Sequence, residues 1–153
     1  VTLSILAEEF HLSAQYISQL FKSEIGVGFL AYLTNIRMEQ AKKMVKIAYQ
    51  ALDEKKGEDI KIINLEGISV LADYFIIANG TNSSQVQALV DNVEEELHKA
   101  GYSLKQREGY SNGNWVLLDF GDVIVHIFDR ENRLFYDLER IWRDGKEIAF
   151  DEL

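Results

Sequence analysis

The chain has 153 residues, 47% of them hydrophobic and 27% charged, so it can bury a packed core. It has no cysteine and three histidines, which excludes a disulfide framework, a thiolate metal site and a cysteine nucleophile. The apolar runs fall short of the ~20 residues of a membrane span, and the chain does not open on a basic-then-apolar signal segment. We therefore expect a soluble, cytoplasmic protein without membrane association.

The net charge of −9 is distributed unevenly along the chain. Residues 1–44 hold four basic and four acidic side chains, so residues 45–153 carry the whole negative charge. An acidic body repels nucleic-acid phosphates and favours a basic protein surface as its partner. The asymmetry also suggests that two pieces of different origin, residues 1–44 and residues 45–153, have been joined.

Two short amphipathic helices are predicted at the start of the chain. The first covers Leu3–Phe10, whose apolar residues recur at helical spacing. After a three-residue break, Ser13 is placed to cap a second helix that ends near Gly26. This order of elements is typical of a helix-turn-helix.

Residues 6–22 (LAEEFHLSAQYISQLFK) resemble the first helix-turn-helix of the AraC-type transcription regulators, and the likeness extends to Arg37 and Ala41 in the next helix. The preceding helix and the second subdomain of that family are missing. The resemblance implies groove-facing positions at Ala14, Gln15, Ser18, Gln19 and Lys22. The alternative is a folded helical appendage that makes no contact with DNA, and the zero net charge of residues 1–44 favours it.

A long helix is predicted from Leu30 to Lys56, because these residues include no glycine or proline and keep an apolar stripe at helical spacing. Gly57 is placed to end this helix. The helix passes straight through the change of charge near residue 44, so we expect it to be shared by both pieces.

The remaining residues alternate between strand and helix patterns, which predicts a mixed β-sheet flanked by helices in a layered α/β (α+β) fold. Asn82, with Gln85 three residues later, is typical of a helix start, and Gly101 of a helix end. The predicted strands are 59–65, 74–78, 103–108, 115–120 and 123–128, and a closing helix is predicted at 131–142 with Leu134, Phe135, Leu138, Ile141 and Trp142 buried.

Residues 45–153 resemble the ribosomal silencing factor (Iojap-like) family over nearly their whole length. The resemblance is carried by AYQALDEKKGEDI at 48–60, ADYFIIANGT at 72–81, WVLLDFGDVIVHIF at 115–128 and FYDLERIW at 135–142. It implies a nucleotidyltransferase-like fold without that chemistry, no cofactor and a homodimer. It also implies binding to the large ribosomal subunit through its ribosomal protein fourteen, which blocks joining of the small subunit and represses translation when nutrients are scarce.

The strand at 115–120 suggests how a partner is bound. Trp115, Leu117 and Asp119 share one strand face, and tryptophan is a frequent energetic anchor of interfaces. The alternative for Trp115 is a core residue whose ring nitrogen donates to a backbone carbonyl. Acidic side chains nearby suit a basic ribosomal protein. The predicted partner-binding residues are Trp115, Leu117, Asp119, Asp122, His126 and Tyr136.

Two other functions are consistent with parts of the sequence. Asp119, Asp122 and His126 could form a magnesium or acid–base site, but a turn at Gly121-Asp122 and a hydrogen bond of His126 inside the sheet are the favoured explanation. The 80–85 loop, GTNSSQ, lacks the carboxylates that a nucleotidyltransferase needs, so we expect no enzyme activity. The other alternative is a DNA-binding regulator with a dimerising α/β body, in which Gln15, Ser18, Gln19 and Lys22 face DNA.

Overall fold

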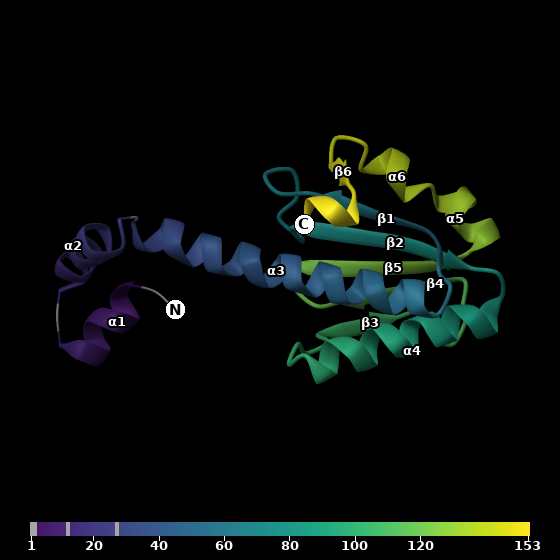
Figure 1. Ribbon diagram of the computed structural model, residues 1–153, viewed down its shortest axis with the longest axis horizontal. Coiled ribbons are helices and arrows are strands. Elements are labelled where there is room, and N and C mark those ends of the chain that lie inside the picture. Colours follow the sequence, from purple (N-terminus) through teal and green to yellow (C-terminus); the bar gives the residue numbers. More distant parts are fainter. Residues whose placement is uncertain (1–2, 12, 27) are drawn as a thin grey trace. The chain divides into compact units, whose positions relative to one another are not determined.

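The computed structural model (Figure 1) describes residues 3–11, 13–26 and 28–153. The chain forms two compact units, residues 1–40 and residues 41–153. Among the described helices, none combines the length and the apolar character that crossing a membrane requires.

The first unit contains the two predicted short helices, α1 (Leu3–Phe10) and α2 (Ala14–Ile25). Ser13 caps α2 by accepting a hydrogen bond from the Tyr16 backbone N–H at 3.1 Å. Gly26 ends it in the left-handed region, at φ 87°, where a residue without a Cβ is favoured. Both predicted ends of α2 are therefore confirmed.

The long helix α3 (Phe29–Glu54) is continuous, as the apolar stripe predicts. The backbone N–H of Gly57 donates to the carbonyl of Leu52 at 2.8 Å and closes its last turn. In the second unit, Ala41, Ala48 and Leu52 are completely buried. This end of α3 therefore forms part of the main core.

The second unit is built on a six-stranded mixed sheet, which confirms the predicted fold class. In the strand order β3-β4-β5-β2-β1-β6, only β2 and β5 run parallel to each other. The strands are β1 (Glu58–Asn64), β2 (Tyr74–Gly80), β3 (Gln106–Glu108), β4 (Trp115–Asp119), β5 (Val123–Asp129) and β6 (Lys146–Ile148).

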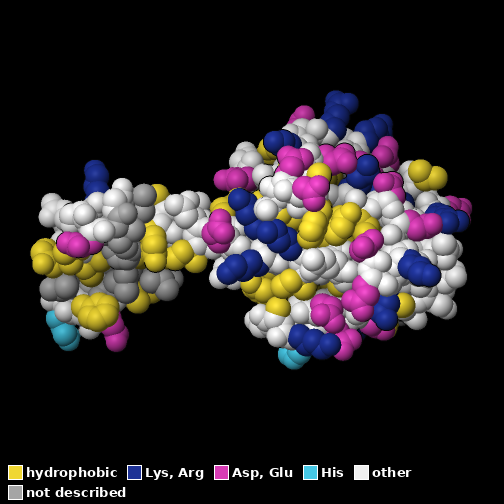
Figure 2. All heavy atoms as spheres, viewed as in Figure 1, with side chains coloured by type: hydrophobic (Ala, Val, Ile, Leu, Met, Phe, Trp, Pro, Cys, Tyr) yellow, Lys and Arg dark blue, Asp and Glu magenta, His cyan; other side chains and the backbone are white. Residues whose placement is uncertain are grey.

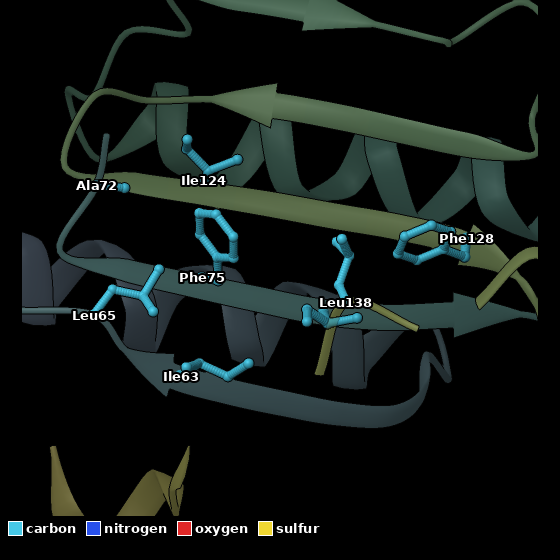
Figure 3. Packing of buried hydrophobic residues seen from close by; sticks show 8 residues of the cluster. Ile63, Leu65, Ala72, Phe75, Ile124, Phe128 and Leu138 are labelled. Carbon is cyan, nitrogen blue, oxygen red and sulfur yellow. The ribbon is translucent and has the colours of Figure 1, made fainter. Parts of the chain in front are cut away.

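Helices α3 and α4 (Ser83–Lys99) lie behind the sheet in the view of Figure 3. The Asn82 side chain caps α4 by accepting from the Gln85 N–H at 2.9 Å, which confirms the predicted start. The Asn92 amide donates to the Ala51 carbonyl at 2.8 Å and ties α4 to α3. These two helices bury one face of the sheet.

A second apolar cluster lies on the opposite face (Figure 3). Strand alternation determines its membership, because the in-register pair Phe75 and Ile124 points to this side while Ile76 and Val125 point to α3 and α4. Leu138 from the C-terminal helices packs on it. Trp115, Leu117 and Trp142 pack against it but are only partly buried, so this face is incompletely covered.

The prediction of one closing helix at 131–142 is wrong. The chain forms α5 (Arg130–Tyr136) and α6 (Leu138–Ile141), separated at Asp137, which has a left-handed φ of 48°. Aspartate tolerates this conformation because its short polar side chain forms local hydrogen bonds. The break leaves three residues that were predicted to be buried exposed instead: Leu134 at 82%, Phe135 at 78% and Ile141 at 61%.

The sequence patterns also missed the end of the chain and overestimated one strand. Residues 146–148 add β6 to the edge of β1, and a short 3-10 helix (Phe150–Glu152) follows. The strand predicted at 103–108 is reduced to Gln106–Glu108. Elements of three residues are too short to produce a recognisable periodicity.

Candidate functional site

The incompletely covered sheet face is formed in part by β4. Its side chains alternate as predicted: Trp115, Leu117 and Asp119 are half-buried, whereas Val116 and Leu118 are completely buried. Each half-buried residue pairs in register with a residue of β5, namely Phe128, His126 and Ile124. The sheet thus brings an indole, an aliphatic side chain and a carboxylate to one surface.

Trp115 is held on three sides. Its indole Nε1–H donates to Nδ1 of His126 at 3.1 Å. Its ring stacks on Phe128 with centroids 5.2 Å apart, and the ring of Tyr136 lies 4.6 Å away. The predicted backbone-carbonyl acceptor is therefore wrong, because the acceptor is a side chain, although Trp115 does pack against the core cluster while only partly buried.

The aromatic contacts continue onto α5. The ring of Tyr136, which is 40% exposed, contacts that of Phe135 with centroids 5.2 Å apart and planes nearly perpendicular. Phe135 is largely exposed. We refer to Trp115, Leu117, Phe135 and Tyr136 as the aromatic surface.

His126 lies beneath the aromatic surface and is only 3% exposed. Burial lowers its pKa from 6.5 to about 3, so the imidazole is neutral at physiological pH. Its Nε2 has no hydrogen-bond partner among the residues that the structure describes, and its ring meets Phe75 edge-to-face at 4.6 Å. His126 therefore presents almost no surface of its own to a partner.

Asp119 and Asp122 flank the turn between β4 and β5. The carboxylate of Asp119 accepts from the Gly121 N–H at 2.7 Å, and Gly121 has a φ of 93°. The backbone carbonyl of Asp122 accepts from the N–H groups of Asp73 and Tyr74 at the start of β2. Among the described residues, no group of three or more acidic or histidine side chains could hold a metal ion. The Asp119 side chain therefore stabilises the turn, whereas Asp122 contributes its backbone carbonyl to the start of β2.

An ion-pair network that the sequence did not indicate connects the C-terminal helices to the sheet. Arg133 is 6% exposed, and its guanidinium donates to Glu139 at 2.9 Å and to the side-chain oxygen of Asn79 at 2.9 Å. Nearby, Arg130 pairs with Glu58, and this hydrogen bond lowers the pKa of Glu58. Asn79, Arg130, Arg133 and Glu139 line a cavity of about 300 Å³. The network fixes α5, which carries Phe135 and Tyr136.

The predicted DNA-facing residues all lie on α2. Gln15, Gln19 and Lys22 are exposed and Ser18 is partly exposed. Their spacing places them on one side of the helix. Contact with DNA stays a prediction for these four side chains.

Fold and site together define a layered α/β protein with a mixed sheet, one face of which presents half-exposed aromatic side chains. The family model described as "Ribosomal silencing factor during starvation" matches residues 38–153. The chain belongs to this family.

Individual relatives agree with the family match. The chain is 43% identical to "Ribosomal silencing factor RsfS" of Bacillus subtilis (strain 168) over 110 residues, 72% of this chain and 93% of that protein. It is 31% identical to "Protein Iojap, chloroplastic" of Zea mays, covering 67% of this chain and 45% of that one. A crystal structure from Chromobacterium violaceum matches with a TM-score of 0.65 at 36% identity, over 71% of this chain and 89% of that chain.

Proposed function

We propose that this protein silences translation by binding ribosomal protein fourteen of the large ribosomal subunit and thereby blocking the small subunit. Membership of the ribosomal silencing factor family supports a ribosome-associated role in silencing translation. The observation that carries the proposal for this chain is the partly buried Trp115, which contacts His126, Phe128 and Tyr136 at an incompletely covered sheet face.

A fixed tryptophan at a surface is suited to anchoring a protein interface. Its ring supplies a large apolar contact area, and such residues often dominate binding energy. Because its neighbours already restrict Trp115, binding need not order a mobile side chain, which otherwise costs about 0.5–1.5 kcal/mol. Leu117, Phe135 and Tyr136 extend the same contact area around it.

The charge of the second piece supports a basic partner. Residues 45–153 carry the entire net charge of −9. Asp119 lies on the same sheet face as Trp115, and Glu108 pairs in register with Leu117 at the edge of this face. Figure 2 shows acidic side chains interspersed with basic ones over the visible side of the molecule. Complementary charge accelerates association with a lysine- and arginine-rich protein and makes it sensitive to salt.

In this proposal the protein acts by steric obstruction. It occupies the face of the large subunit that the small subunit must reach, and no covalent bond is made or broken. We further propose that it acts in the cytoplasm without a cofactor and that it forms homodimers. These features are implied by the family resemblance.

Subunit joining measured by sedimentation tests this function. Purified protein added to separated subunits should reduce the fraction that sediments as whole ribosomes. Trp115→Glu should abolish the effect, because it places a charge where the partner removes water. Leu30→Glu is the matched control, since Leu30 is 75% exposed in the first unit and receives the same charge. Unchanged joining at saturating wild-type protein would refute the proposal.

DNA binding is a second candidate for residues 1–44, because α2 is capped as predicted and exposes Gln15, Gln19 and Lys22 along one side. A salt titration of binding to duplex DNA tests it. Phosphate contacts would make the affinity fall steeply as salt increases. Absence of binding at low salt would remove this candidate.

A further inference from the structure

The hydrogen bond between Trp115 and His126 determines which part of the indole a partner can reach. The indole has a single polar group, its Nε1–H, and this group already donates to His126 Nδ1 at 3.1 Å. His126 is 3% exposed, so the bond points into the protein. The accessible part of Trp115 is therefore the hydrocarbon part of its ring.

We propose that His126 is a positioning residue for docking, which turns the polar edge of Trp115 inward and fixes the ring for its partner. The inference rests on the proposed function and specifies the chemistry of the contact. The partner packs an aliphatic stem or another apolar surface on the indole, and it does not accept a hydrogen bond from it.

The surroundings of His126 favour this role over simple packing. Because Nδ1 accepts from Trp115, the ring proton is on Nε2, which is buried and has no hydrogen-bond partner in the part of the chain that the structure describes. An unsatisfied buried donor reduces stability, whereas an aliphatic residue of similar volume would not carry this cost. The cost is offset by the acceptor that the imidazole provides to Trp115 and that an aliphatic residue would lack. Phe75 and Phe128 contact the same ring and hold it in place.

Two substitutions separate positioning from packing. His126→Leu removes the acceptor and keeps an apolar side chain, whereas His126→Asn keeps an acceptor at the same number of bonds from the backbone as Nδ1. We expect His126→Leu to weaken binding of the full chain to purified large subunits by roughly tenfold. His126→Asn should bind large subunits with nearly the affinity of the wild type. If His126→Leu does not fold, His126→Phe also lacks the acceptor and retains a ring.

The spectroscopic readout is the indole N–H signal of Trp115 in ¹H–¹⁵N spectra, distinguished from that of Trp142 by a Trp142→Phe variant. Hydrogen exchange of this proton should be slow in the wild type, faster in His126→Leu and slow again in His126→Asn. A purely structural role for His126 would lower thermal stability without this pattern.

The outcomes distinguish the two hypotheses. If His126→Leu binds large subunits as tightly as the wild type while its Trp115 indole N–H exchanges faster, the positioning role is overturned and the proposed function stays intact. An indole proton that exchanges equally fast in all variants would also overturn it. No binding of wild-type protein to large subunits would overturn the proposed function and the positioning role together.

Discussion

Arg133 provides the most demanding test of the structure, because a buried charge connects the aromatic surface to the sheet. Its guanidinium donates to Glu139 and Asn79, and its Nη2 lies 2.8 Å from the Glu139 carboxylate. We predict that Arg133→Met destabilises the second unit by about 3 kcal/mol. Methionine preserves much of the packing of the stem, so the loss is mainly electrostatic.

The magnitude follows from what the two closest partners, Asn79 and Glu139, lose. The side-chain oxygen of Asn79 would lose its Arg133 donor while remaining buried, which costs about 1–3 kcal/mol. The side chain of Glu139 is 33% exposed, so water replaces part of its lost ion pair and its contribution is smaller, about 1 kcal/mol. A fully buried pair would cost about 3–5 kcal/mol, which sets the upper limit.

Urea denaturation followed by tryptophan fluorescence measures this change. Both tryptophans lie in residues 41–153, so the signal reports on the second unit alone. Arg130→Met is the matched control, because the Arg130 side chain is 62% exposed and pairs with Glu58 at the surface, where such pairs contribute about 0–1 kcal/mol. If Arg133→Met and Arg130→Met differ by less than about 0.5 kcal/mol, the network does not stabilise the fold as described.

Phe135→Ser should change the free energy of unfolding by less than about 0.5 kcal/mol but impair binding to large subunits, because Phe135 is 78% exposed; a large loss of stability would show that Phe135 is buried. Because the folded pKa of His126, about 3, is below 6.5, the unfolded chain binds more protons between these values. The free energy of unfolding therefore falls with decreasing pH, by up to ~1.4 kcal/mol per unit from this group. His126→Asn should flatten a pH series of urea denaturations, and identical slopes would contradict this. A chain of residues 38–153 should block subunit joining as the full chain does, whereas loss of the effect would assign residues 1–37 an essential part.

Long, strongly periodic elements could be predicted from the sequence, and short ones could not. The stripe of α3, the cap at Asn82 and the alternation of β4 each follow from local side-chain geometry. The break at Asp137 could not be found, because the apolar residues on both sides continue a helical spacing. Their exposure depends on how α5 is fixed to the sheet, which is a tertiary effect.

In the candidate site, too, local patterns could be predicted from the sequence and tertiary contacts could not. The sequence alone predicts that Trp115 and Leu117 lie on one face, because side chains alternate along β4. The partner of the indole N–H depends on the register between β4 and β5 and on the burial of His126. The burial of Arg133 could not be predicted from the sequence, because an arginine in an amphipathic helix usually faces solvent. Its partners are the buried Asn79 on β2 and the partly exposed Glu139 on α6.

Photo-crosslinking to the ribosome tests the central claim most directly. Replacing Phe135 with benzoylphenylalanine puts a reactive aromatic ring on the aromatic surface, and the same replacement at Phe10, 63% exposed in the first unit, is the control. After irradiation with large subunits, we predict a crosslink from position 135 to ribosomal protein fourteen and none from position 10. A crosslink from position 135 to a different component, or equal yields from both positions, would contradict docking through this surface.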